Sequence, residues 1–169
     1  MLQNDYCWEN PDRAYISHDI FLPGPKYEEE LPQIVFGIDT SGSIGDHEKT
    51  TYANEISGVL EQFQCTIKAI YCDTKVRHTQ DLATDDLPIK LEIRGGGGTL
   101  FSPVFDYIEK HELEPKVILF FTDMCVWSND FGRDPGVPVL WMNTNRRKDK
   151  QAVPFGKVIP LELTDKKDK

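Results

Sequence analysis

The sequence predicts an α/β fold with a doubly wound, mostly parallel central sheet that contains one antiparallel strand. Two apolar runs without alternation, at residues 34–38 and 117–121, are typical of central parallel strands that are covered on both faces. Segments with a helical spacing of apolar residues separate these runs from other strand-like segments. Strands that alternate with helices in this way predict a Rossmann-like, layered arrangement.

The overall composition supports a single folded domain and excludes some partners. At 169 residues with 39% hydrophobic residues, the chain can bury a substantial core. Its formal net charge of −9 argues against nucleic acid as a partner, because neutralising phosphates requires a basic face. No apolar run approaches the length of a membrane span, and the N-terminal residues lack the pattern of a signal peptide. We therefore expect neither a nucleic acid nor a membrane as partner.

The four cysteines predict reduced thiols. Cys7, Cys65, Cys72 and Cys125 are irregularly spaced, with no C-x-x-C pair and no zinc-type spacing. Packing in the core is their expected role. Together with the missing signal peptide, this predicts a cytoplasmic protein.

The ends of the chain differ from its middle. Residues 1–32 contain four prolines and a charged run with little periodicity, which predicts an extended N-terminal arm. The arm is too apolar for a free tail, so we expect it to wrap around and pack on the domain of residues 33–163. Its apolar residues are Trp8, Tyr15, Ile16, Ile20, Phe21 and Leu22. Residues 164–169 form a charged tail.

In the first half of the domain, the sequence predicts a helix and two strands after the strand at residues 34–38. Apolar residues at helical intervals predict a helix over residues 46–63. The β-branched and aromatic content of residues 65–71 predicts a second strand. A turn at Asp73 and Thr74 then returns the chain as an antiparallel strand over residues 76–79.

The second half begins with irregular segments. Residues 80–90 are acidic and predict a loop or short helix, and the four glycines at 95–98 require a special backbone conformation or a close approach. A helix follows up to about Lys110, with Pro103 in its first turn. Further strands are predicted at 117–123 and 137–142, with one short strand within 153–163.

Oxygen-bearing side chains follow the two central strands and the glycine loop. Asp39, Ser41 and Ser43 leave the first strand, Thr99 follows the glycines, and Asp123 ends the strand at 117–123. The carboxyl ends of parallel strands form the edge where such sheets bind ligands. Carboxylate and hydroxyl oxygens suit Mg²⁺ or Mn²⁺, so a metal site is predicted there. A plain strand-to-helix turn in which Ser43 caps the next helix is the alternative.

This pattern resembles the metal-ion-dependent adhesion site of von Willebrand factor A (VWA) domains. The resemblance covers residues 33–163 and rests on D-x-S-x-S at Asp39, Thr99 in a glycine-rich loop, and Thr122-Asp123 after an apolar strand. The glycine loop, Pro138-Val-Leu-Trp141 and Pro154-Phe-Gly156 also resemble the C-terminal VWA-like domain of predicted bacterial metallopeptidases.

The resemblance implies that five residues hold a divalent ion, some of them through water. These residues are Asp39, Ser41, Ser43, Thr99 and Asp123. Two positions depart from the family pattern: Leu100 stands where an acidic residue often follows the Thr, and Met124 stands where a Gly commonly follows the Asp.

The sequence contains no recognisable catalytic constellation. H-E-x-x-H is absent, since His47-Glu48 is followed by Thr51 and His111-Glu112 by Pro115, and no G-x-S-x-G elbow or P-loop occurs. The enzyme alternative is a Mg²⁺-dependent phosphatase of the haloacid dehalogenase kind, but Ser41 replaces its second Asp. Cys125 has no evident His partner as a nucleophile.

We therefore expect a metal-dependent interaction module that captures an Asp or Glu of a protein partner. The alternatives are a docking domain within a larger metallopeptidase or AAA ATPase-coupled assembly, and a structural domain with a vestigial site. Without a metal site, the surface near Trp127 or the acidic loop at Asp85 would be the place for a partner.

Overall fold

The computed structural model describes residues 2–7, 24–28, 31–91, 96–126, 130–145, 147 and 152–163, with the first two ranges described as backbone alone. The chain divides into two compact units, Met1–Leu31 and Pro32–Lys169. In the described part of the chain, no helix has the length and apolar character needed to cross a membrane.

The first unit contains two strands that the sequence did not predict. Strands β1 (Leu2–Cys7) and β2 (Gly24–Glu28) pair antiparallel, with Leu2 opposite Glu28 and Cys7 opposite Gly24. The predicted extended arm thus includes a two-stranded sheet. The apolar residues from Trp8 to Leu22 lie outside the described residues, and packing of the arm on the domain stays a prediction.

The second unit is built on a six-stranded sheet of order β5-β4-β3-β6-β7-β8. Its strands are β3 (Gln33–Asp39), β4 (Thr66–Cys72), β5 (Val76–Leu82), β6 (Val117–Thr122), β7 (Val139–Asn143) and β8 (Lys157–Pro160). All neighbouring pairs are parallel except β4 and β5. The predicted doubly wound α/β fold, with its single antiparallel strand, is confirmed.

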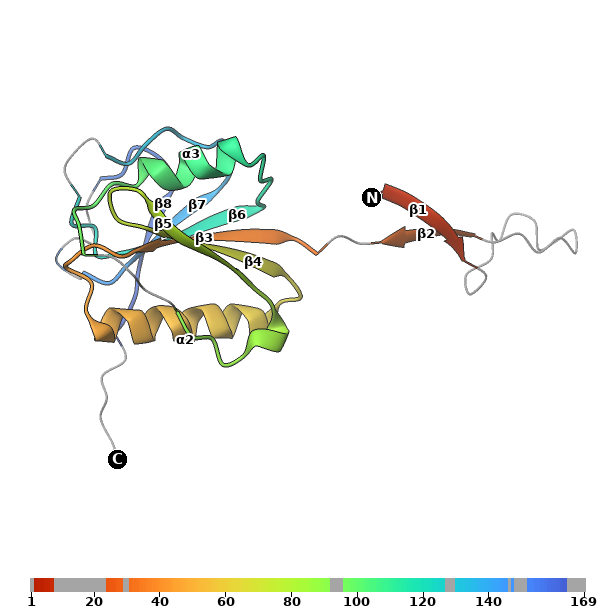
Figure 1. Ribbon diagram of the computed structural model, residues 1–169, viewed down its shortest axis with the longest axis horizontal. Coiled ribbons are helices and arrows are strands. Elements are labelled where there is room, and N and C mark those ends of the chain that lie inside the picture. The colour runs from red at the N-terminus through yellow and green to blue at the C-terminus, as the bar shows by residue number, and fades with distance from the viewer. Residues whose placement is uncertain are drawn as a thin grey trace, which may run out of the picture. The chain divides into compact units, whose positions relative to one another are not determined.

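Helices cover both faces of this sheet. Helix α2 (Asp46–Gln62) lies on one face and α3 (Ser102–Lys110) on the other (Figure 1). Helix α2 matches its predicted range within one residue. The irregular segment between β5 and the glycine loop contains the short 3₁₀-helix η1 (Thr84–Asp86).

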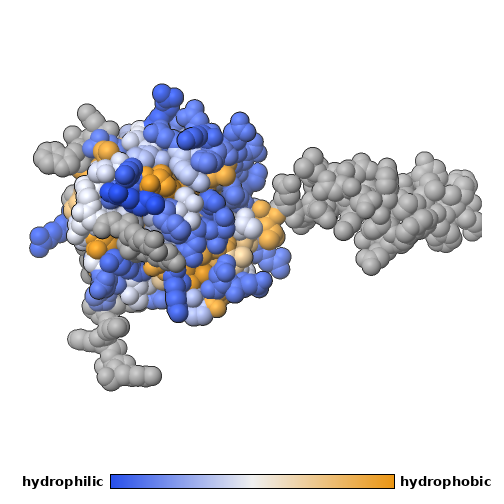
Figure 2. All heavy atoms as spheres, in the orientation of Figure 1, coloured by the Kyte–Doolittle hydropathy of each residue, from blue (hydrophilic) through white to orange (hydrophobic). Residues whose placement is uncertain are grey.

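Each face of the sheet buries its own hydrophobic cluster. On the α2 side, Tyr52 packs against Phe121 with ring centroids 5.0 Å apart. On the α3 side, Trp141 is fully buried among aromatic rings and donates its indole N–H to the Phe155 carbonyl oxygen at 2.9 Å. Cores on both faces explain why the central strands carry continuous apolar runs instead of an alternating pattern. Outside these cores, hydrophilic residues cover most of the visible face (Figure 2).

Pro138 and two of the cysteines occupy the positions expected from the sequence, whereas Cys125 does not. Strand β7 is an inner strand, and Pro138 directly precedes it, where the missing amide hydrogen breaks no ladder bond. The thiols of Cys65 and Cys72 are buried, as core packing requires. Cys125 is exposed, because it lies in the loop after β6, so the expectation of core packing is wrong for this residue. The side chain of Cys7 lies outside the described residues.

Candidate metal centre

The two predicted carboxylates lie at the same edge of the sheet because their strands are neighbours. Strands β3 and β6 are parallel, with Ile38 opposite Phe121, so Asp39 and Asp123 both stand at the carboxyl ends of this pair. Asp39 is 1% exposed and Asp123 is 9% exposed. Neither forms an ion pair with a Lys, Arg or His of the described residues. Two buried carboxylates therefore share one site without an ion pair to a described side chain.

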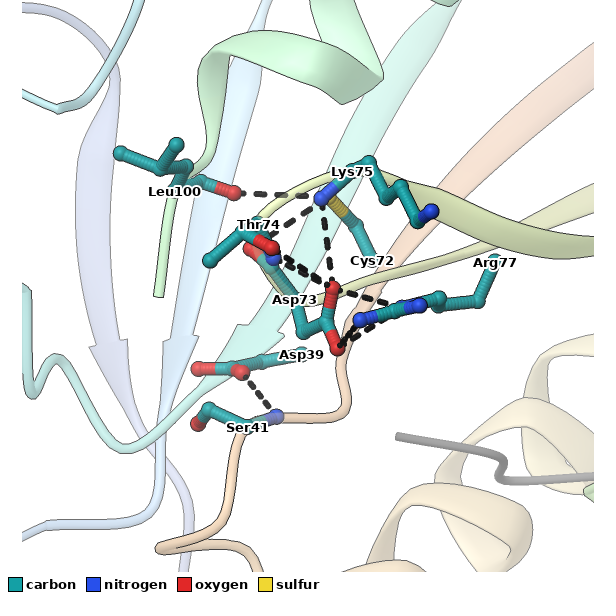
Figure 3. Close-up of polar contacts among 8 residues, drawn as sticks. All are labelled: Asp39, Ser41, Cys72, Asp73, Thr74, Lys75, Arg77 and Leu100. Atoms are coloured by element: carbon teal, nitrogen blue, oxygen red, sulfur yellow. Dashed lines mark hydrogen bonds and ion pairs between the residues drawn. The ribbon is translucent and has the colours of Figure 1, made fainter. Parts of the chain in front are cut away.

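Asp39 is held by two hydrogen bonds, one to each carboxylate oxygen. The Ser41 amide donates to Oδ1 at 2.8 Å, and the Thr122 hydroxyl donates to Oδ2 at 2.8 Å (the Ser41 bond is drawn in Figure 3). Burial raises the pKa of Asp39, the bonds from Ser41 and Thr122 oppose this rise, and the charge of Asp123 adds to it. The carboxylate is oriented but costly to ionise, which a nearby cation would offset.

The two serines follow Asp39 in a tight turn. Their Oγ atoms are 3.1 Å apart, with Ser41 buried and Ser43 exposed. The N-cap of α2 is Gly45, whose amide donates to Glu48 Oε2 at 3.1 Å. The alternative in which Ser43 caps this helix is therefore wrong, and its hydroxyl lies beside that of Ser41 instead.

Thr99 approaches the site through its loop. The Gly42 amide donates to the Gly97 carbonyl oxygen at 3.2 Å, so the glycine loop lies against the turn that carries Ser41 and Ser43. Gly96 has a φ of 142°, a conformation that favours glycine. Thr99 is half-buried, and its side chain makes no hydrogen bond with a described residue. The structure thus brings the loop to the site without joining Thr99 to the other four side chains.

An ion pair between Asp73 and Arg77, which the sequence pattern did not predict, supports the glycine loop. The Asp73 side chain is fully buried and accepts from Arg77 Nε at 2.8 Å and Nη2 at 2.8 Å (Figure 3). Its backbone carbonyl accepts the Leu100 amide at 2.8 Å. A Cβ on Gly97 would lie 3.1 Å from Asp73 Oδ2, so only glycine fits there without displacement.

The charge state of Asp73 follows from these contacts. Burial alone would raise its pKa, but hydrogen bonds from Arg77 and from the Thr74 and Lys75 amides outweigh burial and lower the pKa to about 2. The sequence could have indicated that Asp73 lies near the site, because Asp73 directly follows β4, which pairs parallel with β3. An acidic residue at the end of a neighbouring strand marks the same edge of the sheet.

Asp123 is followed by an unusual backbone turn. Its Oδ1 accepts the Cys125 amide at 2.9 Å, and Met124 has a φ of 58°, in the left-handed region that favours glycine. The Met124 amide donates to the Thr122 hydroxyl oxygen at 3.0 Å, and its side chain is fully buried in the α3-side core. The departure from glycine at this position is thus accommodated by core packing.

The arrangement fits a hard divalent cation better than a thiophilic one. Two carboxylates and the Ser41 and Ser43 hydroxyls provide oxygen ligands, which Mg²⁺ and Mn²⁺ prefer. Among the described residues, no group of three or more His, Cys, Asp or Glu side chains could hold a metal, so a zinc-type cluster is absent there. The donor chemistry is therefore that of carboxylates combined with hydroxyls.

Comparison with known proteins adds one finding. A family model described as "VWA-like domain (DUF2201)" matches residues 34–162, more than half of the chain. No curated protein matches the chain.

Proposed function

We propose that this chain, which belongs to the VWA-like domain family, binds Mg²⁺ or Mn²⁺ and captures an acidic side chain of a protein partner. The fold of this family suggests a protein-interaction module in general. Asp39, Ser41, Ser43, Thr99 and Asp123 are the proposed ligands, directly or through water. The proposed function is binding alone, and no covalent bond of the partner is made or broken.

One observation carries the proposal: Asp39 and Asp123 are both buried at the ends of adjacent strands and form no ion pair with a described side chain. Burying an unpaired charge costs several kcal/mol. A divalent cation would offset this cost for both carboxylates at once. The neutral hydroxyls of Ser41 and Ser43 would fill ligand positions without adding charge.

The ion would supply an electrophilic site that a partner carboxylate can reach. Hard octahedral ions keep exchangeable water, and an Asp or Glu of a partner can replace one water molecule. The hydrogen bonds from Ser41 and Thr122 hold the Asp39 carboxylate in position before the ion binds. A charge-assisted contact of this kind is typically worth about 1.5 to 3 kcal/mol, or roughly tenfold or more in affinity.

Titration of the isolated chain with Mg²⁺ tests the metal site. We expect calorimetric binding and a rise in Tm that grows with the Mg²⁺ concentration, because a ligand that binds only the folded state stabilises it by RT ln(1 + c/Kd), where c is the free ligand concentration. Asp39→Asn preserves the shape of the side chain and should abolish both effects. Asp81→Asn removes an equivalent charge from a side chain that is 79% exposed at the far end of the β4–β5 hairpin, and it should bind Mg²⁺ like the wild type. Equal Mg²⁺ affinity in Asp39→Asn and the wild type would disprove the site.

We also propose that the chain hydrolyses neither peptides nor phosphate esters. The proposal is supported by the missing H-E-x-x-H motif and by Ser41 in place of a second catalytic Asp. Assays with Mg²⁺ and with Zn²⁺ should show no turnover. Turnover that persists through purification and disappears in Asp39→Asn would favour the phosphatase alternative.

A further inference from the structure

A pocket of about 340 Å³ opens directly beside Asp123. It is lined by Glu48 from α2, by Asp123 after β6, and by Thr144, Asn145 and Arg147 after β7. Because β6 and β7 are parallel neighbours, this pocket lies at the same edge of the sheet as the proposed metal ligands. A partner that reaches the metal is thereby brought next to the pocket.

The segment that forms one wall of the pocket is held to the end of β7. Asn143 Nδ2 donates to the Asn145 carbonyl oxygen at 3.0 Å, and the Asn145 amide donates back to Asn143 Oδ1 at 2.9 Å. The Arg147 amide donates to Asn145 Oδ1 at 3.2 Å. Asn143 is 1% exposed, so this network is anchored in the interior. The backbone that presents Arg147 is therefore placed by the fold.

Arg147 is an exposed cation without an acidic partner among the described residues. The two carboxylates that line the pocket have other contacts, since Glu48 Oε2 accepts the Gly45 amide and Asp123 Oδ1 accepts the Cys125 amide. In the sequence, Arg147 belongs to the run 146–150, which contains four basic residues in a chain of net charge −9. The exposed cation Arg147 at a pocket of this acidic chain favours an acidic ligand there.

A buried hydroxyl without a hydrogen-bond partner lies close to the pocket. The Tyr52 hydroxyl is near Thr144, which lines the pocket, yet it makes no hydrogen bond of standard geometry. Burial raises the pKa of Tyr52, and the charges of Asp39, Asp123 and Glu48 raise it further, so the phenol keeps its proton. A proton donor that is buried without an acceptor favours an anionic or water ligand nearby.

The formal charges explain why an acidic ligand would need the metal. The carboxylates of Asp39, Asp123 and Glu48 contribute −3 and Arg147 contributes +1, which gives −2 for the metal-free site. A divalent ion brings this sum to zero. An incoming carboxylate then approaches the Arg147 guanidinium and the metal ion without net electrostatic repulsion from the site.

We propose that this pocket binds a second acidic side chain of the same partner, so that the partner is an acidic segment with one carboxylate at the metal and another at Arg147. This inference rests on the proposed metal site for the first contact. The second contact belongs to Arg147, with Thr144 and Asn145 as neutral neighbours. Arg147 would thus determine the preference for partners with two acidic residues over partners with one.

Synthetic peptides provide the test. One Gly/Ser octapeptide carries a single Glu, and three others carry two Glu residues separated by one, two or three residues. Binding is measured on the Mg²⁺-loaded protein by chemical-shift titration. Two equivalent carboxylates alone give a peptide with two Glu residues a factor of two over the peptide with one. Beyond this factor, at least one peptide with two Glu residues should bind roughly twofold to fivefold tighter, which is the range expected for an exposed ion pair.

Three variants separate the contributions. Arg147→Gln should reduce the advantage of the peptides with two Glu residues to the factor of two that two equivalent carboxylates give. Glu48→Gln should tighten both peptides, because it removes a repelling charge. Arg133→Gln removes an equally exposed arginine that lines a different pocket, against α3, and should leave the preference in place.

The outcomes distinguish this inference from the proposed function. If calorimetry shows no Mg²⁺ binding in the wild type, the proposed function fails. If Mg²⁺ binds but Arg147→Gln retains a preference for two Glu residues beyond the factor of two, or if the wild type has no such preference, the inference about the pocket is overturned while the metal site stands. Thermal unfolding of Arg147→Gln controls for folding.

Discussion

Arg77→Met tests the ion pair beneath the glycine loop by removing the guanidinium while keeping an apolar stem. The pKa of Asp73 falls from an ordinary 3.8 to about 2, which corresponds to about 2 kcal/mol of stabilisation of the charged form. Arg77 supplies only part of this, because the Thr74 and Lys75 amides remain. The Arg77 side chain is also 36% exposed, so solvent screens the pair. We therefore expect a loss of about 1 to 2 kcal/mol in the free energy of unfolding.

The dependence on pH gives this prediction a second, independent readout. A carboxylate whose pKa is lowered by folding stabilises the protein fully above its unfolded pKa, and this stabilisation is lost as pH falls through the folded pKa. For Asp73 the window extends from about pH 4 down to about pH 2. The difference in stability between the wild type and Arg77→Met should therefore be largest near pH 7 and shrink within this window.

Urea denaturation at several pH values measures both effects, with Lys68→Met as the matched control. Lys68 pairs with Asp81 at 2.9 Å in the same hairpin, but Asp81 is 79% exposed, so this variant should cost no more than about 1 kcal/mol. If Arg77→Met were no more destabilising than Lys68→Met, or if its deficit were the same at pH 3 as at pH 7, the assignment of a stabilising ion pair would be refuted.

Three further substitutions make shorter predictions. Gly58→Ala should raise the stability by about 0.5 to 1 kcal/mol, because Gly58 lies inside α2 with no heavy atom within 4 Å of an added Cβ; a lower Tm would contradict this. Gly37→Ala should lower the stability by about 1 to 3 kcal/mol in the same denaturation assay, since its Cβ would lie 2.6 Å from the buried Phe120 ring. Thr99→Ala should change the stability by less than about 0.5 kcal/mol while weakening Mg²⁺ binding in calorimetry, and unchanged affinity would remove Thr99 from the ligand set.

The sequence by itself determined the layers of the fold and the edge at which the candidate site lies. The apolar run before Asp39 and the run before Asp123 predicted strands buried on both faces, and the helical period of residues 46–63 predicted a helix that packs on such a sheet. These features can be recognised within a single segment, because the spacing of buried residues along a helix or strand follows from the geometry of that element. The shared direction of parallel strands then places the residues at their carboxyl ends along one edge of the sheet.

Tertiary structure decided which residues meet at that edge. Thr122 donates to Asp39 across 83 positions of sequence, and this contact exists only because β6 pairs directly with β3. The ion pair of Asp73 with Arg77 became a support for the glycine loop only when that loop was laid across the β4–β5 turn. Strand order depends on the packing of complete faces against one another, and the periodicity of a single segment carries no information about its neighbours.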